Sequence, residues 1–178
     1  MRVEKKLPKI ALRAKRLDDA ALDYQWQTDL EFSRLHVQPP LTLSFTEFAA
    51  EYAIILKNQW PGRIQFAIET GEGLHIGDCA CHNINRATKE AEIGINIGRR
   101  EYWGQGYGVA ALRGLVDYTF RQTDLQKLRL RTLPDNLRAQ RCFAKAGFTV
   151  AGSVREGEVS FVQMELTRRD WEKQAEKQ

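Results

Sequence analysis

The sequence contains no uninterrupted apolar stretch of about eighteen residues, the length that marks a membrane-spanning helix, so we predict a protein that does not cross a membrane. It is also poor in cysteine, and its three cysteines cannot all pair with one another. This usage is typical of a reducing compartment, and the cytoplasm is the simplest choice.

Two of the cysteines, Cys79 and Cys81, lie two positions apart on a predicted strand and therefore on one face of it. That placement suits neither a disulfide between them nor a zinc knuckle. The run Cys79-x-Cys81-His82 also has no second pair of ligands elsewhere in the sequence. We therefore predict no metal site.

The charge balance is mildly basic. The chain has 27 lysines and arginines against 23 acidic residues, which gives a formal net charge of +4. These basic residues are scattered rather than clustered with stacking aromatics, so we do not predict nucleic-acid binding. A mildly basic surface instead helps to attract a small anionic ligand. With 178 residues, of which 43% are apolar, the chain is expected to form a single domain over residues 1–178.

Hydrophobic periodicity predicts a mixed α/β (α+β) domain. Alternation with period two indicates seven strands, at residues 10–16, 63–70, 74–82, 91–98, 127–133, 148–154 and 159–166. Capping signals and apolar spacing predict four helices. The first runs from a cap at 17–19 to Trp26, and the second begins at the capping box Ser44–Glu47. The third runs from a glycine-rich loop to about Phe120, and the fourth from Asp135 or Asn136 to Gly147. On the second helix Phe48, Tyr52 and Ile55 are expected to share a face.

The most informative segment is the glycine-rich run Tyr102–Leu112, in which Gly104, Gly106 and Gly108 occupy alternate positions. It follows a predicted strand and leads directly into an apolar-periodic helix. Glycines allow an anion to approach the backbone, and the first helical turn presents unpaired N–H groups at the positive end of the helix dipole. We therefore predict a site for a phosphate or pyrophosphate.

Two interpretations of this loop compete. Gly106-x-Gly108-x-x-Ala111 matches the dinucleotide fingerprint, and Asp135 lies at a suitable distance downstream. However, that fingerprint normally follows a continuously apolar strand, whereas here Ile93, Ile95 and Ile97 alternate with polar residues and glycine. The strand pattern favours a different anionic cofactor.

Several segments together resemble one family. They are the loop Trp103–Gly108, the run Asn136–Ala139, the run Phe143–Phe148, and, upstream, Ile76–Asp78 and Ala91–Ile95. In this order and spacing they resemble the GNAT superfamily of N-acetyltransferases, in the branch similar to the ribosomal-protein N-terminal acetyltransferases. Trp103 stands where glutamine or arginine is usual in the superfamily. The resemblance covers about residues 10–167, which we take as the core of the domain.

The resemblance implies a mostly antiparallel central sheet of about seven strands, flanked by helices and splayed at strands four and five. It implies acetyl-CoA as co-substrate, with the pantetheine arm bonded by strand four around Ile97 and Gly98 and by Asn136. For Asn136 a plain helix cap is the alternative. The predicted cofactor-binding residues are Ile97, Gly98, Trp103, Gly104, Gln105, Gly106, Tyr107, Gly108, Val109, Asn136 and Phe143.

For the chemistry, acetyl transfer needs a neutral amine and a protonated leaving thiol. Asn136 and Glu92 are the predicted catalytic residues. Glu92 projects from the strand 91–98 on the face opposite the isoleucines, where a carboxylate can take the ammonium proton through water. Glu90 and His82 are alternatives, and parity places His75 on the other face of its strand from His82.

The general acid is the clearest departure from the superfamily. Many members carry tyrosine where Phe143 stands, and phenylalanine has no proton to donate. Cys142, Tyr102 and Tyr107 are the candidate substitutes. A thiol is a tolerable leaving group with water as the acid, so the departure leaves the predicted fold and cofactor unaffected.

The predicted function is transfer of acetyl from acetyl-CoA to a primary amine by direct attack in a ternary complex. The candidate acceptors are a peptide N-terminus, a polyamine and an antibiotic-like amine, and the branch resemblance favours the first. The alternative is a catalytically weak or inactive CoA-binding module that acts as a sensor or interaction surface. Exposed strand edges at the C-terminal hairpin are compatible with a homodimer.

Overall fold

The computed structural model describes residues 6–58 and 62–176, and the structural statements below refer to these residues. The strands are β1 (Ile10–Arg13), β2 (Ile64–Thr70), β3 (His75–Asn85), β4 (Glu90–Ile97), β5 (Lys127–Thr132), β6 (Thr149–Glu156) and β7 (Val159–Thr167). The α-helices are α1 (Ala20–Gln27), α2 (Leu30–His36), α3 (Phe45–Lys57), α4 (Tyr107–Gln122), α5 (Leu137–Lys145) and α6 (Arg168–Ala175). Short 3-10 helices, Leu17–Asp19 and Arg100–Tyr102, precede α1 and the glycine-rich loop.

The seven strands form one sheet in the order β1-β2-β3-β4-β5-β7-β6. Neighbouring strands pair antiparallel except β4 and β5, which run parallel. This parallel pairing covers only Glu90–Glu92 against Lys127–Arg129, and beyond it the two strands diverge. The predicted fold, with a mostly antiparallel sheet splayed at strands four and five, is confirmed.

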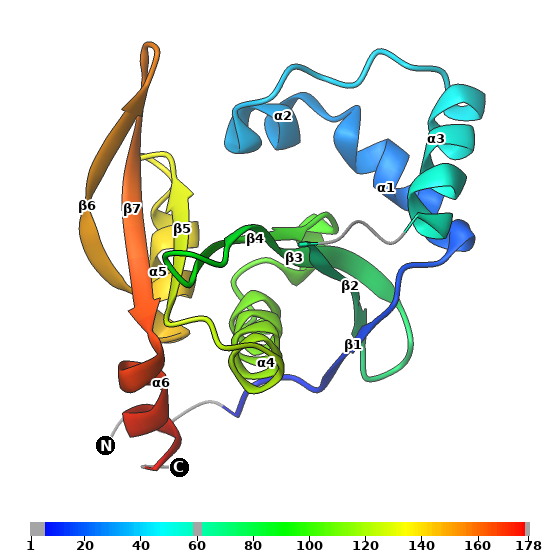
Figure 1. Ribbon diagram of the computed structural model, residues 1–178. Coiled ribbons are helices and arrows are strands. Elements are labelled where there is room, and N and C mark those ends of the chain that lie inside the picture. Colours follow the sequence, from blue (N-terminus) through cyan, green and yellow to red (C-terminus); the bar gives the residue numbers. More distant parts are fainter. Residues whose placement is uncertain (1–5, 59–61, 177–178) are drawn as a thin grey trace.

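The main core lies between the sheet and α4. Figure 1 shows α4 against one face of the half-sheet β1–β4, and α1, α2 and α3 on the other side of it. Leu112, Leu115 and Phe120 recur at helical spacing along α4 and are buried against the strands. Cys79 and Cys81 share the face of β3 that belongs to this core, and both are buried free thiols. None of the described helices is both long and apolar enough to cross a membrane.

The predicted element boundaries need several corrections around the first helices. Strand β1 ends at Arg13 rather than at residue 16. Asp19 does not cap α1, because its carboxylate is bonded instead to the Arg13 guanidinium and to the Arg16 N–H. Helix α2 was missed, since its seven residues are too few to establish a period. On α3, Phe48 and Tyr52 are buried, but Ile55 is exposed.

A register shift in the β2–β3 pairing overturns the parity argument about the histidines. Ile68 pairs with Gly77 but Glu69 pairs with His75, so Ile76 is an extra residue on β3. The bulge reverses the alternation between His75 and the rest of the strand. His75 and Asp78, an odd number of residues apart, therefore both reach the Lys15–Asp23 ion pair on the α1 side of the sheet.

Candidate functional site: a cleft at the splayed strands

The free edge of β4 is defined by the main-chain groups that already pair with β3. The Gly98 N–H donates to the Ile76 carbonyl over 2.9 Å. Hydrogen-bonded residues alternate along an antiparallel pair, so the main-chain groups of Ile95 and Ile97 point the other way, into the gap between β4 and β5. The orientation of the Ile97 carbonyl is consistent with this, because it accepts from the Trp103 Nε1–H over 2.6 Å rather than from β3. An extended ligand can therefore pair with this edge.

The glycine-rich loop continues from that edge into α4. Gly104 and Gly106 adopt φ values of 73° and 97°, which glycine tolerates far better than other residues. The N–H groups from Gly104 to Val109 have no acceptor within the described part of the chain. The first three helical N–H groups, those of Tyr107, Gly108 and Val109, also lie at the positive end of the α4 dipole. The loop is thus built to bind an anion through its main chain.

A cleft of about 2000 Å³ extends along the gap and the loop. Ten of the eleven predicted cofactor-binding residues line it: Ile97, Gly98, Trp103, Gly104, Gln105, Gly106, Gly108, Val109, Asn136 and Phe143. The exception is the Tyr107 side chain, which packs edge-on against the Tyr102 ring with centroids 4.9 Å apart. The segments that the sequence singled out separately are therefore brought to one cleft.

Trp103 has a role that the sequence did not suggest. Besides its bond to Ile97, its ring lies 3.3 Å from the Arg138 guanidinium of α5 and 5.7 Å from that of Arg100. Arg100 in turn pairs with Asp29 and Glu31 at the start of α2. The indole thus connects the β4 edge, the glycine-rich loop and α5 at the mouth of the cleft. The spacing of the sequence gave no signal for these long-range contacts.

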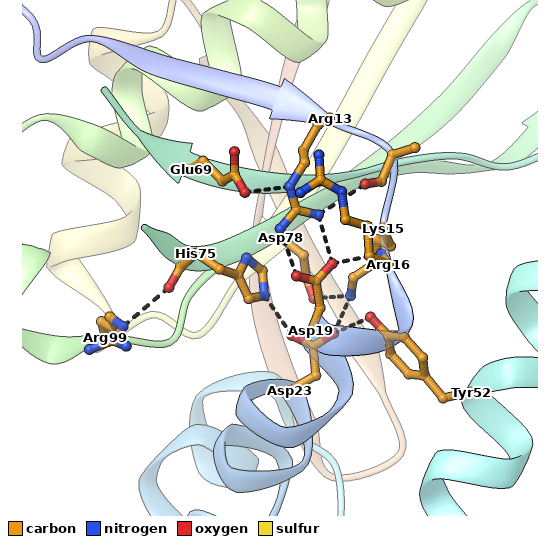
Figure 2. Close-up of polar contacts among 11 residues, drawn as sticks. Arg13, Lys15, Arg16, Asp19, Asp23, Tyr52, Glu69, His75, Asp78 and Arg99 are labelled. Carbon is orange, nitrogen blue, oxygen red and sulfur yellow. Dashed lines mark hydrogen bonds and ion pairs between the residues drawn. The ribbon is translucent and has the colours of Figure 1, made fainter. Parts of the chain in front are cut away.

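The α1 side of the cleft is anchored by a buried ionic network. Figure 2 shows Asp23 of α1 within reach of Lys15, Tyr52 and His75. Its carboxylate accepts from Lys15 Nζ at 2.6 Å, from Tyr52 Oη at 2.8 Å and bonds His75 Nε2 at 3.0 Å. The His75 carbonyl accepts from Arg99 Nε at 3.1 Å, so the network reaches the residue that follows β4 and Gly98. It fixes α1 relative to the end of β4.

Glu92 lines the cleft from β4 together with His82 from β3. Glu92 Oε2 lies 3.2 Å from Asn83 Nδ2 and 3.9 Å from His82 Nδ1. Burial lowers the pKa of His82, with Arg63 and Arg131 acting in the same direction and Glu92 opposing it. The imidazole is therefore neutral near pH 7. The other alternative, Glu90, forms ion pairs with Arg129 and Lys127.

The cleft contains four carboxylates, those of Asp29, Glu92, Glu101 and Glu156. Three of them pair with arginine: Asp29 with Arg100, Glu101 with Arg99, and Glu156 with Arg131. Among the described residues, Glu92 has no lysine or arginine partner. It is therefore the carboxylate most available to a cationic group entering the cleft.

The α5 residues occupy the other wall. Asn136 caps α5, because its Oδ1 accepts from the Ala139 N–H over 3.2 Å, while the residue also lines the cleft. Both interpretations of Asn136 are thus compatible with its position. Phe143 is buried beside Cys142, and burial raises the pKa of the Cys142 thiol to about 11. Such a thiol is a poor acid toward a thiolate whose own pKa is about 8.5.

Comparison with known proteins decides the family. Residues 9–149 match the family model of the acetyltransferase (GNAT) domain, which is most of the chain. The chain belongs to the GNAT family. It is an acetyl-CoA-dependent N-acetyltransferase, and the predicted superfamily, enzyme class and co-substrate are confirmed.

Individual GNAT relatives are distant. An uncharacterised N-acetyltransferase, p20, of Bacillus licheniformis is 27% identical over 164 residues, covering 84% of each protein. A putative ribosomal N-acetyltransferase, YdaF, of Bacillus subtilis (strain 168) is 29% identical over 59% of this chain and 62% of its own length. A kanamycin resistance protein of Rhizobium radiobacter is 37% identical over 70 residues, 39% of this chain and 65% of its own length.

Solved GNAT structures share the fold. Spermidine N-acetyltransferase from Vibrio cholerae, in complex with CoA and spermine, superposes with a TM-score of 0.79 at 20% identity, over 91% of this chain and 97% of the other. The aminoglycoside acetyltransferase AAC(6')-Ib in complex with coenzyme A gives 0.78 at 21% identity, over 94% and 99%. At these identities the likeness concerns the fold.

Proposed function

We propose that this enzyme acetylates a single primary amine, the α-amine of a peptide or protein, by direct attack on acetyl-CoA in a ternary complex. The pyrophosphate of CoA is bound by the N–H groups of the loop Gly104–Val109. The pantetheine arm follows the free edge of β4 at Ile95 and Ile97, which brings the thioester toward the point where β4 leaves β5. Asn136 supports the arm from the opposite wall.

The position and charge of Glu92 are the main support for this proposed function. It lies near the point of divergence and, within the described residues, is the cleft carboxylate that no arginine or lysine neutralises. It attracts the ammonium form of the acceptor and draws off its proton, so that a neutral amine reaches the thioester. The leaving thiolate is protonated by water or by the acceptor itself, because Phe143 supplies no proton.

The charge of the cleft favours a peptide over a polycation. A polyamine or an aminoglycoside presents several ammonium groups and needs several free carboxylates. Here Asp29, Glu101 and Glu156 are each paired with an arginine. One α-amine needs only one such carboxylate. The name of the Bacillus subtilis relative, a putative ribosomal N-acetyltransferase, agrees with this choice.

The substitution Glu92→Gln tests the proposal. It removes the charge and the proton acceptor but keeps the shape, so kcat for peptide acetylation should fall by about 100-fold or more. CoA affinity, measured by calorimetry, should change less than twofold. A matched control is Asp124→Asn, which removes an exposed carboxylate paired with Lys89 and should leave kcat unchanged.

Undiminished kcat in Glu92→Gln would refute the role of Glu92. Tight CoA binding by the native enzyme without turnover of any amine would favour a CoA-binding module instead.

A further inference from the structure

His82 and Glu92 are directly opposite each other in the β3–β4 register. Their side chains are on the cleft face and are 34% and 39% exposed, so both are accessible to a bound ligand. The carboxylate lies on the Nδ1 side of the imidazole, at 3.9 Å, and Asn83 Nδ2 holds it there at 3.2 Å. The two residues form a cross-strand pair in which the carboxylate lies beside Nδ1 of the imidazole, so that Nε2 is on the opposite side of the ring.

The other edge of the imidazole faces Gly94. A Cβ atom at Gly94 would lie 3.5 Å from His82 Nε2 and 4.0 Å from its Cδ2. Gly94 is two residues beyond Glu92, at which the pairing of β4 with β5 ends. The absence of a side chain at this position leaves space in front of Nε2. His82, Gly94 and Ile95 line the same cleft, so this space belongs to the cleft in which the thioester is proposed to lie.

We propose that His82 is a catalytic residue, which takes the proton directly from the acceptor amine through Nε2, with Glu92 orienting the ring at Nδ1. This inference rests on the proposed function. His82 takes the place of the water that would otherwise connect the amine to Glu92. The arrangement follows the general logic of a base that is itself oriented by a third group.

The charges around the ring suit this task. Glu92 of β4 faces Nδ1, while Arg63 next to β2 and Arg131 of β5 contribute positive charge from the neighbouring strands. Burial and the two arginines keep the imidazole neutral near pH 7, with a lone pair free to accept a proton. Glu92 favours the tautomer with the proton on Nδ1 and stabilises the imidazolium once it forms.

The step balances without a further reactant. His82 Nε2 accepts one proton from the ammonium group of the acceptor, which becomes a neutral amine. The amine nitrogen forms a bond to the thioester carbon, and the carbon–sulfur bond then breaks. A second proton of the same nitrogen passes to the departing CoA thiolate. The imidazolium finally releases the first proton to solvent, so that one ammonium and one thioester give one amide, one thiol and one proton.

The pH dependence of His82→Gln tests the proposal, with saturating acetyl-CoA and a peptide acceptor. At pH 7 we expect kcat/KM to fall by about 100-fold or more, within the range attributed to general base catalysis. Because a peptide α-amine has a pKa of about 8, raising the pH to about 9.5 supplies the amine already neutral, and the defect should shrink to less than about tenfold. A residue that only supports the strand would not show this recovery. CoA affinity should remain within twofold of the native value.

Three outcomes would overturn the proposal. The first is a wild-type rate in both His82→Gln and His82→Asn, the second variant guarding against a local packing effect. The second is an equal loss of rate at every pH, which indicates a structural role. The third is an acid limb that keeps its native midpoint in His82→Gln but moves toward the pKa of the amine in Glu92→Gln, which would make Glu92 the direct base. A native enzyme that acetylates no amine would instead refute the proposed function itself.

Discussion

The indole of Trp26 covers the backbone of Gly98: a Cβ atom at Gly98 would overlap the ring at Cδ2, Cε2 and Cε3. Trp26 belongs to α1, and its ring also packs against His75, with ring centroids 5.0 Å apart. Gly98 is the first residue after β4, where the chain turns toward the glycine-rich loop. This contact and the Asp23–His75 pair together hold α1 against the end of β4, beside the free edge of that strand.

Gly98→Ala should therefore be destabilising. Because the new methyl group must displace the indole or the strand end, we expect a loss of about 1–3 kcal/mol in the free energy of unfolding, measured by denaturant titration. Gly94→Ala is the matched control, because Gly94 lies within β4 and a Cβ atom there would have its nearest neighbour at an ordinary 3.5 Å. Equal stability of the two variants would show that the Trp26 contact is not tight.

The conformation of Gly106 gives a second prediction. Its φ of 97° and its proximity to Pro8 and Leu7 leave little tolerance for a side chain. Gly106→Ala should reorient the loop N–H groups and weaken CoA binding by about tenfold, corresponding to about 1.4 kcal/mol. Gly73→Ala carries the same backbone strain, at φ 83°, in the turn between β2 and β3. It should lose stability but bind CoA normally in calorimetry. Equal CoA affinities in the two variants would contradict binding at the loop.

Trp103→Phe isolates the bond to the Ile97 carbonyl. The variant keeps an aromatic ring beneath Arg138 but removes the Nε1–H donor, so we expect a loss of about 1 kcal/mol in unfolding free energy and a raised KM for acetyl-CoA. Trp103→Gln provides a donor and should retain more of the acetyl-CoA affinity than Trp103→Phe. If both variants behave alike in steady-state kinetics, the bond does not position the β4 edge.

The fold could be predicted because its signals are local. The alternation of Ile93, Ile95 and Ile97, the capping box at Ser44 and the spacing of Gly104–Gly108 each specify an element within a few residues. Such signals predicted the succession of strands along the chain, whereas the position of the splay came from the family resemblance. Helix α2 could not be predicted from local signals, because it is short and depends on tertiary contacts, such as that of Asp29 with Arg100.

The site was predictable only in part. The loop and Glu92 follow from strand parity and from the glycines, because backbone geometry dictates which groups face the gap. The placement of His75 did not follow, because the bulge at Ile76 leaves no mark in the sequence and reverses the parity. Nor did the contact of Trp103 with Arg138, since residues 35 positions apart meet only through the packing of α5.

Acid should destabilise the protein through Asp23. Burial alone would raise its pKa, but hydrogen bonds from His75, Lys15 and Tyr52 and the charge of Lys15 outweigh this, and the pKa is lowered from the ordinary 3.8. A lowered carboxyl pKa stabilises the fold above the unfolded-state value and loses that contribution as pH falls through the folded-state value. The unfolding free energy should therefore decrease progressively below about pH 4.

Asp23→Asn checks this assignment. At pH 7 the variant should lose about 3 kcal/mol, because the buried Lys15 ammonium loses one of its two carboxylate partners. The difference from the native protein should narrow as the pH falls below about 4 toward the folded-state pKa, since protonation of the native carboxylate removes the same charge. A difference that stays constant over this range would show that Asp23 does not titrate with folding.

Acetylation of a peptide α-amine is tested by thiol release from acetyl-CoA in the presence of a peptide with a free N-terminus. The comparison acceptors are the same peptide acetylated at that end, spermidine and kanamycin. We expect stoichiometric thiol release and acetylation of the free peptide, none with the blocked peptide, and a much lower kcat/KM for the two polycations. Preferential turnover of spermidine or kanamycin would contradict the peptide assignment, and release with none of the acceptors would contradict a peptide acetyltransferase altogether.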